Sequence, residues 1–158
     1  MEKLPHHYYV SLKADDQPDI KVESPGLGMI RSAAPIQFGG PGNLWSPETL
    51  LVAAVADCLA LTFKSVAKAI SLKWTTFTCN AEGTLDRTEG VTRFTAIDLH
   101  VNLAVPPETD HERARAALER AERGCLIGNS LRFAPVLHAE VVEEVNCGES
   151  LGGGVLAY

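Results

Sequence analysis

The sequence lacks the features that mark several functional classes. Its 158 residues carry a formal net charge of −6, and no Lys/Arg-rich run of five or more residues occurs. An acidic chain without a basic stretch argues against nucleic acid or an anionic membrane surface as the main partner. The start, MEKLPHHYYV, lacks the long apolar stretch of a signal peptide. The most apolar segment, Leu50 to Phe63, is shorter than the roughly 20 residues that span a bilayer. We therefore expect a cytoplasmic protein with no nucleic-acid or membrane partner.

The sequence also lacks Cys and His residues at the spacings typical of metal sites. The chain has four cysteines but no CxxC pair, and no Cys/His cluster has the spacing of a zinc site. We therefore expect no metal and no organic cofactor. In the cytoplasm such cysteines are reduced or redox-active more often than they form structural disulfides.

Turn-forming residues dominate the first third of the chain. HHYYVSLK and DIKVES are typical of short strands, and a Gly/Pro-rich stretch from Ser24 to Leu44 predicts turns and loops. A helix start follows, with Ser46 as the N-cap, Pro47 at the first helical position and Glu48 complementing the helix dipole. From Leu50 to about Ile70 the chain has no Gly or Pro and is apolar on nearly every face. This pattern predicts a central, buried helix.

Two long strands and a second helix are predicted next. WTTFTCNAEGTLD leads through a turn at 87–90 into VTRFTAIDLHVNLAV, whose apolar and polar residues alternate as in a half-buried strand. His100 falls on the wet face of this strand, and we interpret it as solvated rather than as a ligand or base. Thr109–Glu112 matches a capping box, and Gly124 is expected to end the helix that begins there. PVLHAEVVEEV is expected to close the core as a final strand.

The order of these elements predicts the fold class. Strands, a buried helix, a long hairpin, a second helix and a final strand indicate an α+β protein. No internal repeat or low-complexity segment divides the chain. We expect one domain over residues 1–158, with its core at about 7–146 and a flexible tail at 147–158.

The four cysteines differ in their sequence surroundings. Cys58 lies in the apolar run AAVADCLALTF, where it is either a packing residue or a nucleophile, because free cysteine also behaves as a small hydrophobe. Cys79, in mid-strand, is interpreted as core, and Cys147, beside a Gly-rich tail, as incidental. Cys125 follows Gly124 at the start of a new turn, where backbone N–H groups stabilise a thiolate. Cys125 is therefore a better redox candidate than a cysteine in mid-strand.

Three short motifs follow one another in a defined order. They are the helix start Ser46–Leu50, the A-x-C triplet Ala56–Cys58, and the segment Cys125–Ser130, whose cysteine lies 67 positions beyond Cys58. Together they resemble the OsmC/organic hydroperoxide resistance (Ohr) family of thiol peroxidases, over roughly Ser24 to Val145. The resemblance implies an OsmC-like α+β fold and an intertwined homodimer with two active sites at the subunit interface.

Within this resemblance each site residue is matched by position. Cys58 matches the cysteine that attacks the peroxide, and Cys125 matches the cysteine that resolves the sulfenic acid as a disulfide. Glu48 matches the supporting carboxylate. The supporting arginine would come from the N-terminal strands or loops, and Arg31 is nominated because it is the sole arginine before Cys58. Leu126 stands where many members have proline, which indicates an OsmC-like branch and leaves the substrate preference open.

Reduction of a peroxide requires Cys58 as a thiolate, which a nearby cation stabilises. A cysteine with an ordinary pKa of roughly 8.5 is mostly protonated at neutral pH, and apolar burial raises that value. Cys58 therefore needs a nearby cation, which Arg31 would supply while Glu48 orients the guanidinium. Glu48 lies roughly 15 Å before Cys58 along the helix, so it acts through the long Arg31 side chain or comes from a partner subunit. We prefer the dimer.

The resemblance implies a cysteine-based reduction of a small organic hydroperoxide. It would proceed through a Cys58 sulfenic acid and a Cys58–Cys125 disulfide, which an external dithiol then reduces. We expect apolar side chains near Cys58 to accommodate an alkyl body, which favours alkyl over hydrogen peroxide; these side chains are Leu51, Val55, Leu59 and Phe63. Two other functions stay open: a non-catalytic dimeric module that holds a small hydrophobic ligand, and a redox sensor.

Overall fold

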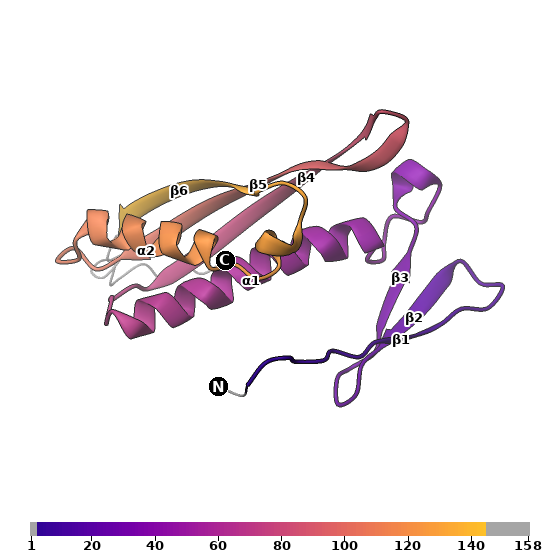
Figure 1. Cartoon of the computed structure of the whole chain (residues 1–158), viewed down its shortest axis with the longest axis horizontal. Coiled ribbons are helices and arrows are strands. Elements are labelled where there is room, and N and C mark those ends of the chain that lie inside the picture. Colours follow the sequence, from indigo (N-terminus) through magenta and orange to yellow (C-terminus); the bar gives the residue numbers. More distant parts are fainter. Residues whose placement is uncertain (1–2, 145–158) are drawn as a thin grey trace, which may run out of the picture.

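Two helices and two three-stranded sheets form the part of the chain described by this computed structural model, residues 3–144 (Figure 1). The larger sheet has the order β4-β5-β6, and both helices pack on one of its faces. The elements of this unit are α1 (Pro47–Ala69), β4 (Thr76–Thr88), β5 (Val91–Val105), α2 (His111–Arg123) and β6 (Val136–Glu143). The predicted α+β class is confirmed.

The larger sheet combines two kinds of strand pairing. β4 and β5 form a long antiparallel hairpin, whereas β6 pairs with β5 in parallel. A parallel neighbour needs a crossover, and α2 provides it between β5 and β6. This connection places the end of α2 beside α1, so the chain returns to the middle of the first helix (Figure 1).

The first helix begins where the sequence predicts. The Ser46 hydroxyl accepts a hydrogen bond from the Thr49 N–H at 3.2 Å, and the Thr49 hydroxyl oxygen accepts one from the Ser46 N–H at 2.9 Å. Pro47 occupies the first turn, where its missing N–H costs nothing. The predicted N-cap is therefore confirmed.

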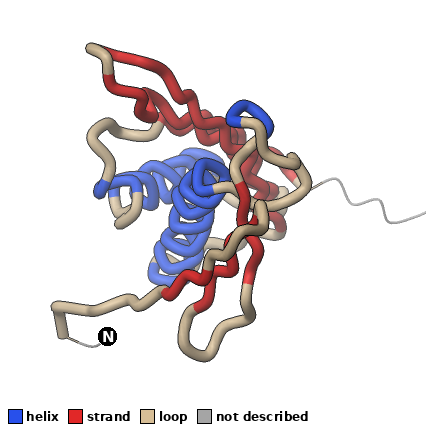
Figure 2. The backbone as a smooth tube through the Cα atoms, turned by 90° about the vertical axis from the view of Figure 1, so that its right-hand side faces the viewer, coloured by secondary structure: helices blue, strands red, loops and turns tan. Residues whose placement is uncertain are grey.

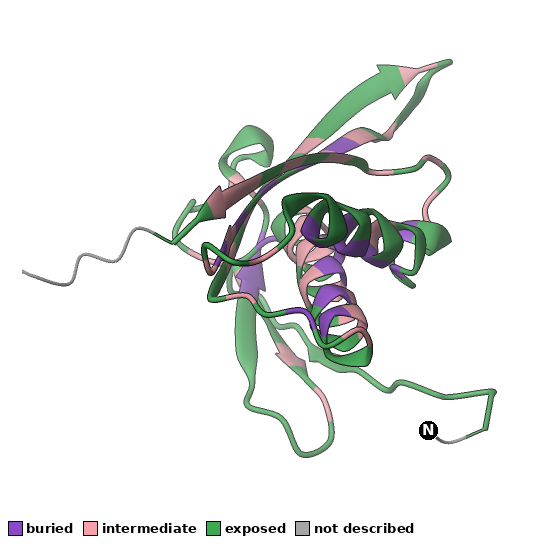
Figure 3. Cartoon of the chain, turned by 90° about the vertical axis from the view of Figure 1, so that its left-hand side faces the viewer, coloured by how far each residue is buried: buried purple, intermediate pink, exposed green. Residues whose placement is uncertain are grey.

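The prediction that this helix is buried on all sides is wrong for the described chain. α1 buries one stripe against the sheet and α2, and much of the rest of the helix is exposed or only half-buried (Figure 3). Leu61, two residues from Leu59 and Phe63 of that stripe, is 56% exposed. The buried stripe consists of Val55, Leu59, Phe63 and Ala67. With 23 residues, α1 is longer than the apolar segment Leu50 to Phe63 that the sequence suggested. By length and composition alone, this helix could cross a membrane. Core helices of soluble proteins pass the same test, so this is weak evidence for a membrane span.

Alternation along β5 places the core on one face of the sheet. Ile97, Leu99, Val101, Leu103 and Val105 are buried beneath the helices. The alternate residues face away, as the period of two requires. His100 is exposed there and stacks on His138, with ring centroids 4.5 Å apart. The predicted wet face of this strand is confirmed.

The second helix begins one residue later than its capping motif suggests. Asp110, not Thr109, is the N-cap, and its carboxylate accepts hydrogen bonds from the N–H groups of Glu112 and Arg113 at 2.9 and 3.3 Å. A carboxylate at this position also complements the helix dipole. Gly124 ends the helix as predicted.

The smaller sheet lies at the N-terminal end of α1, away from the larger one (Figures 1 and 2). It is antiparallel, in the order β1-β2-β3, and its strands are β1 (Ser11–Lys13), β2 (Asp19–Glu23) and β3 (Ile30–Ala33). Most of its side chains are exposed within the single chain. The predicted tail at 147–158, with Cys147, lies outside the described residues.

Candidate active site

Cys58 and Cys125 meet where the end of α2 packs against the middle of α1. Cys58 is half-buried on α1, and Cys125 follows Gly124 and is 4% exposed. The N–H of Ile127 donates a hydrogen bond to the Cys58 sulfur at 3.5 Å. The Cys125 thiol lies close enough to Cys58 for the neighbouring thiol to raise its pKa. Helix packing therefore brings together two thiols that lie 67 positions apart in the sequence.

The turn that carries Cys125 is held by several hydrogen bonds. The Asn129 N–H donates to the Cys125 carbonyl at 2.9 Å, and the Ser130 hydroxyl donates to the Leu126 carbonyl at 2.8 Å. The N–H of Gly128 donates to the Cys125 sulfur at 3.3 Å. A Cβ at Gly128 would come within 3.3 Å of that sulfur, which is tighter than ordinary van der Waals contact. The expected helical turn after Cys125, with an amide directed at the thiol, is therefore present.

The two thiols differ in their environments. The pKa of the Cys125 thiol is raised from 9.0 to about 11, first by burial and also by the neighbouring Cys58, while the Gly128 and Ile127 amides act in the opposite direction. Cys125 is therefore a neutral thiol at physiological pH. Cys58 is the more accessible of the two.

The raised pKa of Cys125 predicts a loss of stability at alkaline pH. The unfolded chain releases this proton near pH 9, whereas the folded chain holds it until about pH 11. Between these values the unfolded state binds fewer protons, so the free energy of unfolding falls as pH rises, by about 1 kcal/mol after allowing for solvent screening. Urea unfolding at pH 8 to 11 should show this loss, and Cys125→Ser should flatten it. Equal slopes in the two proteins would contradict this assignment.

Arg31 and Glu48 are not brought to Cys58 within the described chain. The Arg31 Nε atom donates to the Asp19 carboxylate at 2.7 Å across the β2–β3 pair, and 56% of the arginine side chain is exposed. This hydrogen bond lowers the pKa of Asp19. The Oε2 atom of Glu48 is buried without a hydrogen-bond partner among the residues that the structure describes. The expected Arg31–Glu48 pair does not form in one chain, and both catalytic roles stay predictions.

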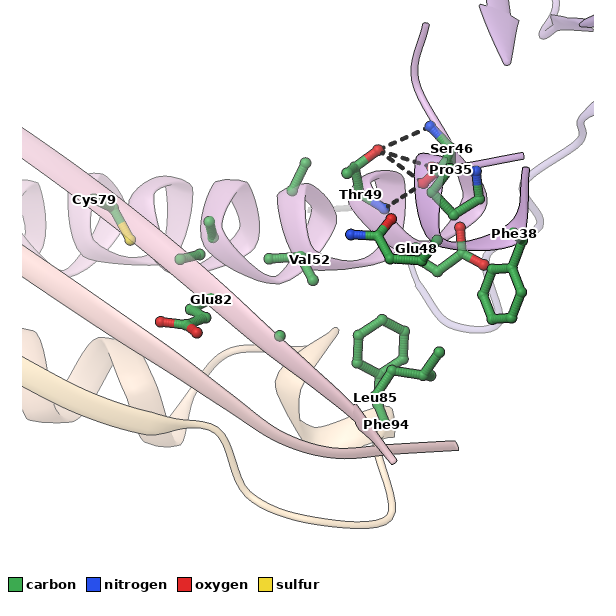
Figure 4. A pocket seen from close by; sticks show the side chains of 15 residues that line it. Pro35, Phe38, Ser46, Glu48, Thr49, Val52, Cys79, Glu82, Leu85 and Phe94 are labelled. Atoms are coloured by element: carbon green, nitrogen blue, oxygen red, sulfur yellow. Dashed lines mark hydrogen bonds between the residues drawn. The ribbon is translucent and has the colours of Figure 1, made fainter. Parts of the chain in front are cut away.

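Glu48 borders a cavity of about 770 Å³ that the sequence did not reveal (Figure 4). The cavity lies between the loop before α1, the first half of α1 and the β4–β5 hairpin. Its lining includes Phe38, Glu48, Val52, Cys79, Leu85 and Phe94. The lining is mostly apolar, so the cavity suits an apolar molecule or apolar side chains of another chain.

Cys79 was interpreted as core, but it also lines this cavity. It points toward α1 from β4, is half-buried, and burial raises the pKa of its thiol. The alternation of Phe77, Cys79 and Ala81 on one face of β4 could have assigned its side of the sheet. The sequence could not show that a cavity lies beside Cys79, because the distance between β4 and α1 depends on tertiary packing.

The expected apolar pocket around Cys58 needs a correction. Val55, Leu59 and Phe63 have no exposed surface, because they form the stripe of α1 that packs on the sheet and α2. Their positions near Cys58 on the helix suggested that they line a pocket. They lie instead on the side of α1 that packs against the sheet and α2, and so belong to the core. They cannot accommodate the body of a substrate in this arrangement.

A half-buried cysteine beside a buried one, where the two helices of an α+β fold meet, defines a class of dithiol protein. The particular family follows from a family model described as OsmC-like protein, which matches residues 40–140. This match covers more than half of the chain and includes both cysteines. The chain belongs to the OsmC-like family.

Individual relatives are distant in sequence but similar in fold. The chain is 23% identical over 133 residues to the uncharacterized protein YmaD of Bacillus subtilis, covering 80% of this chain and 87% of YmaD. An OsmC-like protein of unknown function from Vibrio cholerae superposes with a TM-score of 0.78 at 19% identity, covering 86% of this chain and all of that one. An organic hydroperoxide resistance protein OsmC from Legionella pneumophila gives a TM-score of 0.70 at 22% identity, covering 88% and 98%. These similarities establish the fold.

Proposed function

We propose that this protein is a thiol peroxidase that reduces organic hydroperoxides, with Cys58 as the attacking residue and Cys125 as the resolving residue. The observation that carries the proposal is the proximity of a half-buried thiol, Cys58, to a buried one, Cys125, whose pKa is raised to about 11. Family membership supports a redox role. The organic hydroperoxide resistance proteins of similar fold support the choice of substrate class.

The proposed reaction consumes one peroxide and forms one disulfide. The Cys58 thiolate attacks the terminal peroxide oxygen, the O–O bond breaks, and the alkoxide takes a proton to leave as an alcohol. This step oxidises Cys58 to a sulfenic acid. The Cys125 sulfur then attacks the Cys58 sulfur, a disulfide forms, and the sulfenic hydroxyl leaves as water with the Cys125 proton. An external dithiol, which is itself oxidised to a disulfide, returns both cysteines to thiols.

Thiol counting tests this reaction directly. One equivalent of an alkyl hydroperoxide such as cumene hydroperoxide should remove two thiols per chain, whereas the same dose of hydrogen peroxide should remove fewer in the same time. A dithiol should restore both groups. An unchanged thiol count after alkyl hydroperoxide would reject the enzyme.

We further propose that two chains form the working unit in the cytoplasm. Three features of the single chain support this unit: the exposed apolar side of α1, the exposed smaller sheet, and the Glu48 carboxylate oxygen that has no partner within residues 3–144. A three-stranded sheet is stable when one face packs against something, and here a second chain would provide it. A guanidinium from the second chain would satisfy the buried Glu48 oxygen, and Arg31 is the nominated residue.

A charge on the outer side of α1 should prevent this association. Leu61→Glu places a carboxylate at an apolar position that is 56% exposed in one chain, and burying it unpaired costs several kcal/mol. Sedimentation should show a dimer for the wild type and a monomer for the variant. Val91→Glu makes the same change at the exposed tip of the hairpin and should leave the dimer intact. A wild-type monomer with full peroxidase activity would reject the dimer.

The 770 Å³ cavity supports a second candidate function. A dimeric module that only binds a small hydrophobic ligand would use this cavity and need no redox-active thiol. Such a module would keep all its thiols in the counting experiment and would bind an apolar fluorescent probe. Loss of two thiols per chain distinguishes the enzyme from this module.

A further inference from the structure

Two consecutive backbone amides lie against the pair of cysteines, and both lower the pKa of the Cys125 thiol. The N–H of Ile127 donates to the Cys58 sulfur at 3.5 Å, and the N–H of Gly128 donates to the Cys125 sulfur at 3.3 Å. The 3₁₀ turn Gly128–Ser130 follows directly. One short segment of main chain therefore supplies a hydrogen-bond donor to each sulfur.

The effect of each amide depends on the burial of the sulfur that it meets. A hydrogen bond to an ionised sulfur is stronger than one to a neutral sulfur, so a fixed N–H favours the thiolate. At Cys125 burial outweighs this effect, because the pKa of that thiol is still raised. Cys58 is less buried, so burial opposes the effect of a backbone N–H donor less strongly at this sulfur.

The nominated guanidinium does not provide this stabilisation within the chain. Arg31 is held by the Asp19 carboxylate, on a sheet at the end of α1. Ile127, by contrast, contacts the reacting sulfur directly. Its N–H is held in place because the turn is fixed by hydrogen bonds from Asn129 to Cys125 and from Ser130 to Leu126.

We propose that the main-chain N–H of Ile127 stabilises the Cys58 thiolate and so makes Cys58, rather than Cys125, the attacking residue. This inference rests on the proposed peroxidase reaction for its consequence, but it concerns the thiolate itself. The donor is already in position before substrate arrives, so no rearrangement is needed when the charge forms. Its role does not depend on the chemistry of the isoleucine side chain.

Ile127→Pro removes this donor. Ile127 has φ −70°, which suits proline, and its N–H donates to the Cys58 sulfur while also lowering the pKa of the Cys125 thiol. Ile127→Val keeps the N–H and is the matched control. The readout is the pH profile of Cys58 alkylation by iodoacetamide, followed by peptide mass spectrometry, which needs no peroxide.

The proline variant should shift the midpoint of this profile upward by about one pH unit and slow alkylation at pH 7 about tenfold. The valine variant should stay within about twofold of the wild type. An unchanged profile in a folded proline variant would overturn the inference.

A second measurement covers a proline variant that fails to fold. In the wild-type protein the ¹⁵N–¹H resonance of Ile127 should titrate with the same midpoint as Cys58 alkylation, and this titration should vanish in Cys58→Ser. A resonance that does not titrate would overturn the inference. The two proposals fail separately: a shifted alkylation profile without peroxide consumption rejects the peroxidase alone, and peroxide consumption with an unshifted profile rejects the amide's role alone.

Discussion

Cys58→Ser is expected to lower the rate of reaction with an alkyl hydroperoxide at least about a hundredfold, because serine cannot form the nucleophilic thiolate. Stopped-flow consumption of the peroxide, with thiol counting at the end, measures this loss. In Cys125→Ser the first step should survive. Its Cys58 sulfenic acid should then persist long enough to be trapped by dimedone, because the resolving thiol is absent.

Cys79→Ser is the matched control for these two variants. Cys79 is also half-buried, and burial raises the pKa of its thiol, but it lies on β4 and lines the cavity. Its replacement should leave peroxide consumption within about twofold and the loss of two thiols intact. A Cys79→Ser variant that loses activity as completely as Cys58→Ser would move the reacting pair to the cavity.

Phe63→Ala is expected to cost about 3–5 kcal/mol of unfolding free energy. Phe63 is fully buried on α1, stacks on Phe77 with ring centroids 5.3 Å apart, and meets Trp74 edge-on at 5.4 Å. Removing its ring leaves a cavity between the helix and β4 and deletes both aromatic contacts. Urea unfolding measures the loss.

Val91→Ala provides the comparison, because Val91 is 53% exposed at the hairpin tip. Its effect on the free energy of unfolding should stay within about 0.5 kcal/mol. A loss below about 1 kcal/mol in Phe63→Ala would mean that another contact holds α1 on the sheet.

Local sequence signals predicted the elements that depend on neighbouring residues. Ser46 as N-cap and Gly124 as helix end follow from hydrogen bonds within one turn, and the alternation in Val91–Val105 follows from the geometry of a single strand. These local signals could not decide whether Thr109 or Asp110 is the N-cap of α2. Both side chains can accept the same amide bonds, and the backbone path decides between them.

The features that sequence could not settle depend on contacts between distant elements. The apolar composition of α1 predicted full burial, but composition does not say how much of the apolar surface a single chain can cover. Arg31 was nominated because no other arginine precedes Cys58. Its pairing with Asp19 depends on the β2–β3 register, which the short strands did not reveal.

The proximity of Cys58 and Cys125 could be predicted only in part. The family resemblance implied the pair, while the sequence alone favoured Cys125 and left Cys58 open. The contact arises because the crossover helix α2 returns the chain to the middle of α1. Its exact form, with the Ile127 amide on the Cys58 sulfur, needed the conformation of the turn.

The most direct test of this account is the disulfide itself. After one equivalent of cumene hydroperoxide, mass spectrometry of the unreduced, thiol-blocked digest should find one linked peptide pair that joins Cys58 to Cys125. Mixing isotopically labelled and unlabelled protein should show that both peptides come from the same chain, since the described contact is made within one chain. A Cys58 oxidised to the sulfinic acid beside a free Cys125, or a disulfide from Cys58 to Cys79, would contradict the account.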